Sequence, residues 1–310
     1  MSQQSTPAHK LLSPLEEWPV DNVAAALLRR SGAAGSGTSV PAGASESKVQ
    51  VVETLGDTAR VFPVASVTKP VVAYGVMLAV EEGAIELDQP AGPEGSTVRH
   101  LLAHASGVGF DSREPQKGVE KRRIYSSAGY EWLADVVAEA TGMDFPEYLR
   151  LGVFEPLGMN DSQLTGSAGH ALETSVNDLV AFASEVLNPT LLHPSTVEQM
   201  RTEQFPALDG IVPGYGMHKP CPWGLGFEIK GDKGRRGGDA AREAKVKPHW
   251  TSESMPASII GHFGMSGTYL WIAPEEGYAM VALTDRDFGD WAKPLWAEDN
   301  EKIWQALAEV

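Results

Sequence analysis

The stretch that most constrains this chain runs from Phe62 to Val80. A short apolar approach ends at Ser66, and the nearly unbroken apolar run Val71–Val80 follows it. Ser66 and Lys69 are three residues apart, and on a helix this spacing places both side chains on one face, a turn apart. The stretch therefore predicts a buried helix that carries a serine and a lysine at its amino end.

This pair of residues is suited to nucleophilic chemistry. A serine hydroxyl is a poor nucleophile until a base removes its proton, and a lysine becomes such a base when burial and nearby positive charge lower its pKa. The pair alone is a weak signal, because the same spacing recurs at Ser45–Lys48, in a Gly/Ser/Ala-rich stretch without a helical pattern. A helix cap beside a solvated lysine remains the alternative at this point.

The net charge of the chain limits the classes of partner that it can bind. With 25 Lys and Arg against 41 Asp and Glu, the net charge is −16, which argues against nucleic acid and anionic membranes as partners. Cys221 is the single cysteine, so an internal disulfide is excluded and a cysteine-based metal site is disfavoured. The first residues lack a basic segment followed by an apolar run, so we expect a cytoplasmic protein. The oligomeric state stays open.

Apolar periodicity gives a coarse map of the elements. It predicts a loose arm over residues 1–18, a helix over 23–30, and a hairpin of strands 49–55 and 59–64 that leads into Ser66. It predicts mostly helices between residues 66 and 200. Late in the chain the pattern predicts a strand over 223–229, an antiparallel meander of strands 257–263, 268–273 and 278–284, and a helix over 298–310. Loops are expected at 35–47, 111–124 and 231–254.

This map predicts a mixed α/β fold in a single domain, residues 1–310. Strands lie near both ends of the chain and helices lie between them. We therefore expect one α/β lobe, from residues 20–72 and 215–310, and one helical lobe inserted in it, from residues 73–214.

Two histidines four residues apart, His100 and His104, have the spacing of paired metal ligands. The glutamate of a zinc protease motif is missing between them, and no third ligand is evident. We therefore predict structural roles for both, and no metal or cofactor.

Two further motifs follow the Ser66–Lys69 pair: Tyr125-Ser126-Ser127, before a predicted helix, and His262-Phe263-Gly264, at the end of a predicted strand. In this order the chain resembles the superfamily of serine β-lactamases, penicillin-binding proteins and family VIII carboxylesterases, on its class C side. That superfamily carries Ser-x-x-Lys, Tyr-x-Asn and Lys/His/Trp-x-Gly. The resemblance covers residues 61–284 and includes family-like stretches at 97–107, 125–134, 156–161, 223–227 and 261–274.

The resemblance implies a β-lactamase/transpeptidase-like fold, in which helices from both ends of the chain flank an antiparallel sheet. It also implies acyl transfer through a covalent intermediate. Ser66 would attack a carbonyl carbon, and Lys69 and Tyr125 would share the proton transfers, with the base left undecided between them. The backbone N–H groups of Ser66 and Met265 would form the oxyanion hole.

The sequence departs from the family at two positions. Ser127 replaces the usual asparagine, so recognition of a substrate amide should weaken. His262 replaces the lysine that pairs with the carboxylate of β-lactam and peptide substrates, and a neutral imidazole does this poorly near pH 7. Gly264 would let a substrate approach the strand edge closely.

Both departures favour ester hydrolysis, because an alkoxide leaves more easily than an amine. We therefore predict a carboxylesterase for small or medium acyl esters, with at most weak β-lactamase activity. Apolar walls could come from Tyr130, Trp223, Phe263 and Met265. Two alternatives remain open: an amidase or D-amino-acid peptidase on the same scaffold, and a non-catalytic binding relative.

Overall fold

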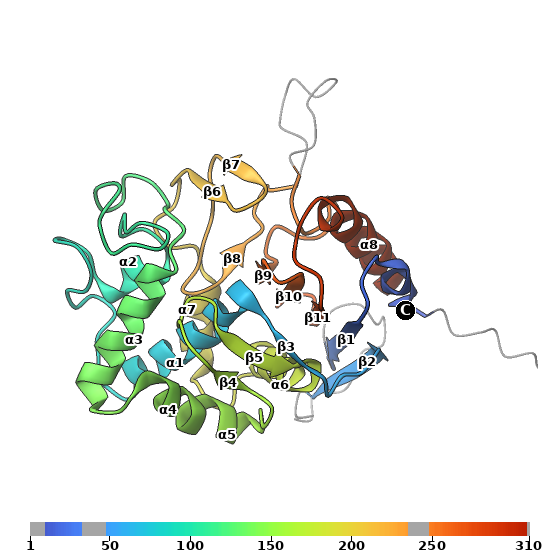
Figure 1. The fold of residues 1–310 in the computed structure, drawn as a ribbon, viewed down its shortest axis with the longest axis horizontal. Helices are drawn as coiled ribbons and strands as arrows, with labels where there is room; N and C mark the ends of the chain where they lie inside the picture. The colour runs from blue at the N-terminus through green and yellow to red at the C-terminus, as the bar shows by residue number, and fades with distance from the viewer. Residues whose placement is uncertain (1–9, 33–47, 235–247, 309–310) are drawn as a thin grey trace, which may run out of the picture.

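The computed structural model describes residues 10–32, 48–234 and 248–308. Its centre is a six-stranded sheet in the order β2-β1-β11-β10-β9-β8, in which every neighbouring pair is antiparallel (Figure 1). The strands are β1 (Val23–Arg30), β2 (Val49–Leu55), β8 (Glu228–Ile229), β9 (Ile260–Gly264), β10 (Thr268–Ala273) and β11 (Tyr278–Thr284). The predicted mixed α/β class with an antiparallel sheet is confirmed.

The helices between the early and late strands gather on one side of this sheet (Figure 1). They are η2 (Ala65–Val67), α1 (Thr68–Glu81), α2 (Val98–Leu102), α3 (Ala128–Thr141), α4 (Phe145–Leu149), η3 (Arg150–Phe154), α5 (Glu155–Leu157), α6 (Val176–Leu187) and α7 (Pro194–Arg201). Two small sheets accompany them: β3 (Val61–Pro63), β5 (Leu172–Ser175) and β4 (Gln163–Leu164) in one, and β6 (Gly210–Val212) with β7 (Gly216–His218) in the other.

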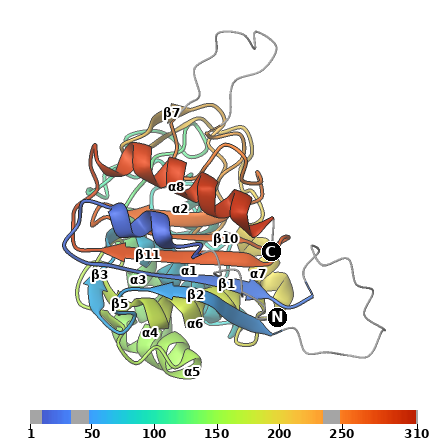
Figure 2. The same ribbon diagram turned by 90° about the vertical axis from the view of Figure 1, so that its right-hand side faces the viewer.

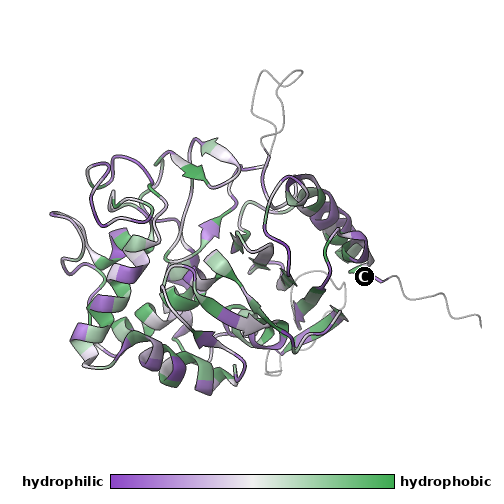
Figure 3. Ribbon diagram, in the orientation of Figure 1, coloured by the Kyte–Doolittle hydropathy of each residue, from purple (hydrophilic) through white to green (hydrophobic). Residues whose placement is uncertain are grey.

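The strands β1, β9, β10 and β11 of the large sheet are buried on both faces, whereas the edge strand β2 is mostly exposed. One face packs on α1 and α6, while α8 (Ala292–Leu307) and the short turn η1 (Ser13–Glu17) cover the other (Figure 2). Helices at the surface, such as α3 and α8, carry both green and purple residues along their length, as helices with one buried side do (Figure 3). The two faces therefore belong to separate hydrophobic cores.

The prediction of a helix over 23–30 is wrong, because this segment is strand β1. Ala24, Ala26 and Leu28 enter the core on the α1 side, and Ala25 and Leu27 enter the core under α8. A strand buried on both faces reads as a continuous apolar run, and periodicity cannot separate such a run from a buried helix. The N-terminal helix expected to flank the sheet is therefore reduced to the short turn η1.

Two strand predictions also need correction. Residues 49–55 and 59–64 do not pair as a hairpin, since β2 pairs with β1 while β3 pairs with β5 in another sheet. Of the strand predicted at 223–229, only Glu228–Ile229 is formed, and the left-handed backbone of Gly226 (φ 93°) interrupts the extended segment before it.

Other predictions hold. The helix after Ser66, the meander β9–β10–β11 and the C-terminal helix are all present, although α8 begins at Ala292 rather than near 298. Within the predicted arm, Leu12 and Leu15 are buried under α8, so residues 10–18 are packed. The predicted loop 35–47 lies outside the described residues, as do residues 1–9 and 235–247. In the part of the chain that the structure covers, no helix is long and apolar enough to cross a membrane.

Candidate active site

Ser66 lies in the tight turn η2, directly before α1. Ala65 adopts a left-handed backbone (φ 45°), which is unusual for a residue with a side chain. The Thr68 hydroxyl stabilises this turn by donating to the Ala65 carbonyl at 2.6 Å, and it accepts from the Leu172 amide at 3.0 Å. Strand β5 thus holds Ser66 at the amino end of α1, where its side chain is half-buried.

Lys69 is fully buried one turn below Ser66. Its Nζ donates to Ser66 Oγ at 3.4 Å, to Ser127 Oγ at 3.2 Å and to the Gly169 carbonyl at 2.7 Å. All three partners are neutral. Burial lowers the pKa of Lys69 to about 7, and the more distant charge of Glu131 partly opposes this shift. Near neutral pH a large fraction of this amine is unprotonated and can accept a proton.

Tyr125 lies against the same amine. Lys69 Nζ is 4.4 Å from the centre of the Tyr125 ring. The phenol is buried, and its hydroxyl makes no hydrogen bond of ordinary geometry with the described residues. Burial raises the pKa of Tyr125 well above its usual value, although the neighbouring Ser66 hydroxyl favours the ionised form. Tyr125 is therefore a protonated phenol at neutral pH.

His104 holds the loop that carries Tyr125. Its Nδ1 accepts from the Ser126 amide at 3.2 Å and its carbonyl accepts from the Ile124 amide at 3.0 Å, so both neighbours of Tyr125 are bound to it. The two rings also pack together, with centroids 4.8 Å apart. His104 has a left-handed backbone (φ 56°). These contacts are structural ones, the kind of role that the sequence predicts for this histidine.

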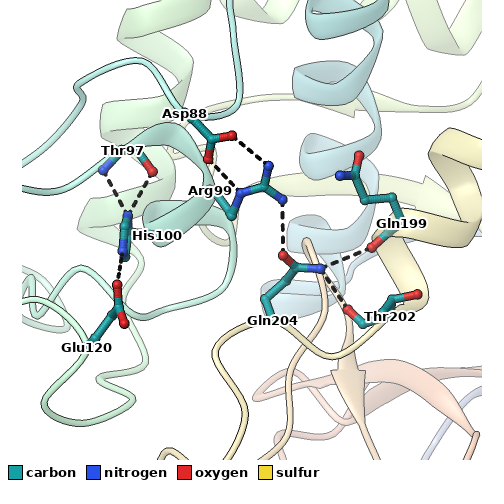
Figure 4. A network of polar contacts seen from close by, with 8 residues as sticks. All are labelled: Asp88, Thr97, Arg99, His100, Glu120, Gln199, Thr202 and Gln204. Atoms are coloured by element: carbon teal, nitrogen blue, oxygen red, sulfur yellow. Dashed lines mark hydrogen bonds and ion pairs between the residues drawn. The ribbon is translucent and has the colours of Figure 1, made fainter.

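His100 ties down the loop that precedes Tyr125 (Figure 4). Its ring contacts Thr97 at the start of α2 and meets Glu120 Oε1 at 2.9 Å through Nε2. The adjacent Arg99 binds Asp88 through two nitrogens, at 2.7 and 2.9 Å, and also reaches Gln204. The two histidines thus have different partners, and within the described ranges no group of three or more His, Cys, Asp or Glu side chains is arranged to hold a metal.

His262 lies on β9, buried beside Tyr125 and Trp223. Its Nδ1 donates to the Phe263 carbonyl at 2.6 Å, which leaves the lone pair on Nε2. Burial, followed by the charge of Lys69, lowers the pKa of His262 to about 3. The imidazole is therefore neutral at physiological pH and supplies no fixed positive charge.

A narrow cavity opens at Ser66, with a free volume of about 40 Å³, enough for a few water molecules. Its walls include Tyr125, His262 and Met265, and Lys69 contacts Ser66 from outside the lining. The lining residues are Ser66, Phe110, Tyr125, Val212, Pro213, Trp223, Glu228, His262, Phe263 and Met265. Tyr130 is not among them, because its hydroxyl donates to the Leu102 carbonyl in the core.

Packing inside the protein requires a glycine at position 264. A Cβ at this position would collide with the Val64 carbonyl oxygen and with the Thr268 hydroxyl. The absent side chain therefore lets β9 lie against the segment that leads into Ser66, where Thr268 Oγ1 donates to the Val64 carbonyl at 3.0 Å. Close approach of a substrate at this edge stays a prediction.

Sequence reasoning did not find Phe110, Val212, Pro213 or Glu228. Glu228 is buried against Lys233 and His249, each 2.9 Å from its Oε1, and Trp250 Nε1 donates to its Oε2 at 2.9 Å. Burial would raise the pKa of the Glu228 carboxyl, but Lys233 and His249 hold that pKa well below its usual range. The signal available in the sequence was the placement of a glutamate, rather than an apolar residue, at the end of the Trp223–Ile229 segment.

Comparison with known proteins identifies a family that agrees with the serine and lysine of this site. The sequence model of the beta-lactamase family matches residues 57–302. This chain belongs to the beta-lactamase family. The crystal structure of a beta-lactamase from Mycobacterium bovis is 42% identical, covers 96% of this chain and 99% of its own, and superposes with a TM-score of 0.83.

Two curated relatives are similar over shorter stretches. Penicillin-binding protein 4* of Bacillus subtilis is 28% identical over half of this chain (50%) and 41% of its own length. Esterase EstB of Burkholderia gladioli is 31% identical over 32% of this chain and 37% of its own. The chain thus spans less than half the length of these relatives. The resemblance inferred from the three motifs is confirmed, and it places the protein in a superfamily of serine hydrolases.

Proposed function

We propose that this protein is a carboxylesterase that forms an acyl-enzyme on Ser66. The observation that carries the proposal is the buried, carboxylate-free contact of Lys69 with Ser66. It pairs a nucleophile with an amine whose pKa is about 7, the value that suits a general base near neutral pH.

In the proposed reaction Lys69 takes the proton from Ser66 Oγ as that oxygen attacks the ester carbonyl carbon. The N–H groups of Ser66 and Met265 stabilise the developing oxyanion. Tyr125, which holds its proton at neutral pH, protonates the leaving alkoxide, and Lys69 then returns the Ser66 proton to Tyr125. Water releases the acyl group in a second step by the same transfers.

Two features support esters over β-lactams and peptides. The neutral His262 does not provide the charge that a substrate carboxylate would need at the third motif. Ser127 contacts Lys69 as the family asparagine would, but it offers one hydroxyl in place of an amide. The likeness to a protein named esterase EstB supports the same choice.

The alternatives have their own support. Likeness to penicillin-binding protein 4* favours an amidase or D-amino-acid peptidase, and likeness to the Mycobacterium bovis beta-lactamase favours some β-lactam turnover. A binding relative without catalysis is the third candidate, supported by Ser127 alone. We also propose a small-molecule substrate, a cytoplasmic location, and no nucleic acid or membrane partner, in keeping with the net charge of −16.

The deciding experiment measures intact mass after incubation with a fluorophosphonate probe. Wild type, Ser66→Ala and the exposed-serine control Ser254→Ala are compared, and turnover of p-nitrophenyl acetate and butyrate is measured on the same samples. We expect one adduct and ester turnover in wild type and in the control, and neither in Ser66→Ala. An adduct without ester turnover would redirect the search to amides, and the absence of both would favour a binding protein.

A further inference from the structure

A second, larger cavity adjoins the one at Ser66. Its volume is about 420 Å³, and it shares Phe110, Tyr125 and Pro213 with the first cavity. The two cavities are therefore neighbours that meet at these three residues. Because Tyr125 is the proposed proton donor to the leaving group, a leaving group bound beside it would extend toward the second cavity.

The charge of this cavity is opposite to that of the chain. Lys117, Arg122 and Arg123 are among its lining residues, and no aspartate or glutamate is. By contrast, three other surface cavities of the described chain each include a glutamate, namely Glu185, Glu94 and the group Glu253, Glu298 and Glu301. The charged residues of this lining are all basic, and in a protein with a net charge of −16 such a cluster favours an anionic ligand group.

Two of the three cations are free to meet that group. Arg123 is buried and donates to backbone carbonyls of Ala103, Gln204 and Cys221, so its role is structural. Lys117 and Arg122 make no ion pair with the described residues, and Arg122 Nη2 has only the Met217 sulfur at 3.4 Å, a weak acceptor.

Apart from Gln116, the remaining lining residues are apolar or aromatic. Phe110 and Ile211 both line the cavity, and they are 51% and 52% exposed, large fractions for such side chains. Phe110 stacks on Tyr125 with ring centroids 5.9 Å apart, and both rings line both cavities. The cavity therefore suits a flat or apolar body that carries its negative charge at the far end.

We propose that the protein selects esters whose alcohol or phenol part is apolar and carries a carboxylate, held by Lys117 and Arg122. This inference rests on the proposed esterase function and names its substrate class. The reaction is ordinary ester hydrolysis: the bond between the acyl carbon and the leaving oxygen breaks as Ser66 is acylated, and the leaving oxygen receives its proton from Tyr125. Water then hydrolyses the acyl-enzyme and adds its oxygen to the acyl carbon, which releases the acid and frees Ser66. The positive charge that binds the substrate would thus come from Lys117 and Arg122 on the leaving-group side. The neutral His262 at the third motif provides no such charge.

The test compares two esters that differ in one charge, 4-acetoxybenzoate and its neutral methyl ester. The ratio of their kcat/KM values is measured for wild type, Arg122→Gln, Lys117→Gln and Lys121→Gln. Using the ratio removes the different reactivity of the two phenols and any general loss of activity. Lys121 is an exposed lysine of the same loop outside the cavity, so its variant controls for net charge.

We expect the ratio to fall roughly fivefold in Arg122→Gln and in Lys117→Gln, and to stay near wild type in Lys121→Gln, as for a partly exposed ion pair. Raising the salt concentration should lower the wild-type ratio in the same direction. Equal ratios in all four proteins would overturn this inference and leave the esterase proposal standing. If wild type turned over neither ester, and p-nitrophenyl acetate also failed, the proposed function would fall and this inference with it.

Discussion

Two buried lysines near the cavity, Lys69 and Lys233, have opposite surroundings. Lys69 Nζ contacts two serine hydroxyls and one carbonyl, all neutral. Lys233 Nζ also contacts carbonyls, those of Pro222 and Ile229, but it meets Glu228 Oε1 at 2.9 Å as well. Both side chains are almost fully buried.

The difference lies in the carboxylate. A buried ammonium without a counter-charge loses its proton more easily, and this is the state of Lys69, whose pKa falls to about 7. When a carboxylate lies beside a buried ammonium, each charge compensates the other. Removing either partner then leaves an uncompensated buried charge and destabilises the fold. The same residue type is thus suited to proton transfer in one place and to holding the cavity wall in the other.

The largest effect should come from removing the amine of Lys69. We expect Lys69→Gln to lower kcat/KM for p-nitrophenyl acetate roughly 10³-fold, because Ser66 loses its base. The control is Lys48→Gln, the exposed lysine of the second Ser-x-x-Lys sequence, which should match wild type. A loss smaller than tenfold would show that another group accepts the proton.

Removing the carboxylate from the second lysine should act on stability. Glu228→Gln leaves Lys233 buried without a counter-charge, and we expect the free energy of unfolding to fall by about 3 kcal/mol. Urea denaturation measures this change. The double variant Glu228→Gln/Lys233→Met should recover part of the loss, since it removes both charges. An unchanged midpoint in Glu228→Gln would contradict this view of the pair.

A smaller effect is expected at His104, which positions Tyr125. His104→Ala should lower kcat roughly tenfold with little change in KM, because the Tyr125 hydroxyl is displaced from the reacting atoms. Asparagine keeps an acceptor close to that of Nδ1 and tolerates a left-handed backbone, so His104→Asn should restore much of the rate. If Asn and Ala behaved alike, the contact with the Ser126 amide would be unimportant.

The smallest effect is a shift of the pH profile. Lys69 must be neutral to accept a proton, so kcat/KM should fall as the pH drops through about 7 and level off above it. Glu131 raises this pKa, so Glu131→Gln should move the acid limb to lower pH. Glu139→Gln, an exposed glutamate on the same helix, is the control. A shift to higher pH would show that Glu131 acts in another way.

Local patterns predicted much of the site and part of the fold. The Ser66–Lys69 spacing, the Tyr125 and His262 motifs and the meander of β9, β10 and β11 depend on short stretches, and the structure brings these stretches together. The prediction failed at β1, since both faces of that strand are buried, and at residues 49–64, whose strands pair with distant partners. In these cases the deciding contacts come from residues far away in the chain.

The sequence by itself determined which residues could act and that Ser66 and Lys69 lie one turn apart, because covalent geometry sets the spacing of residues within a turn. Only the tertiary structure decided their surroundings. It brought Gly169 and Ser127 to Lys69, enclosed the amine without a carboxylate, and supplied one to Lys233. It also gathered Lys117 and Arg122 beside the cavity at Ser66. Burial and the sign of neighbouring charges depend on packing between distant segments, which local periodicity does not encode.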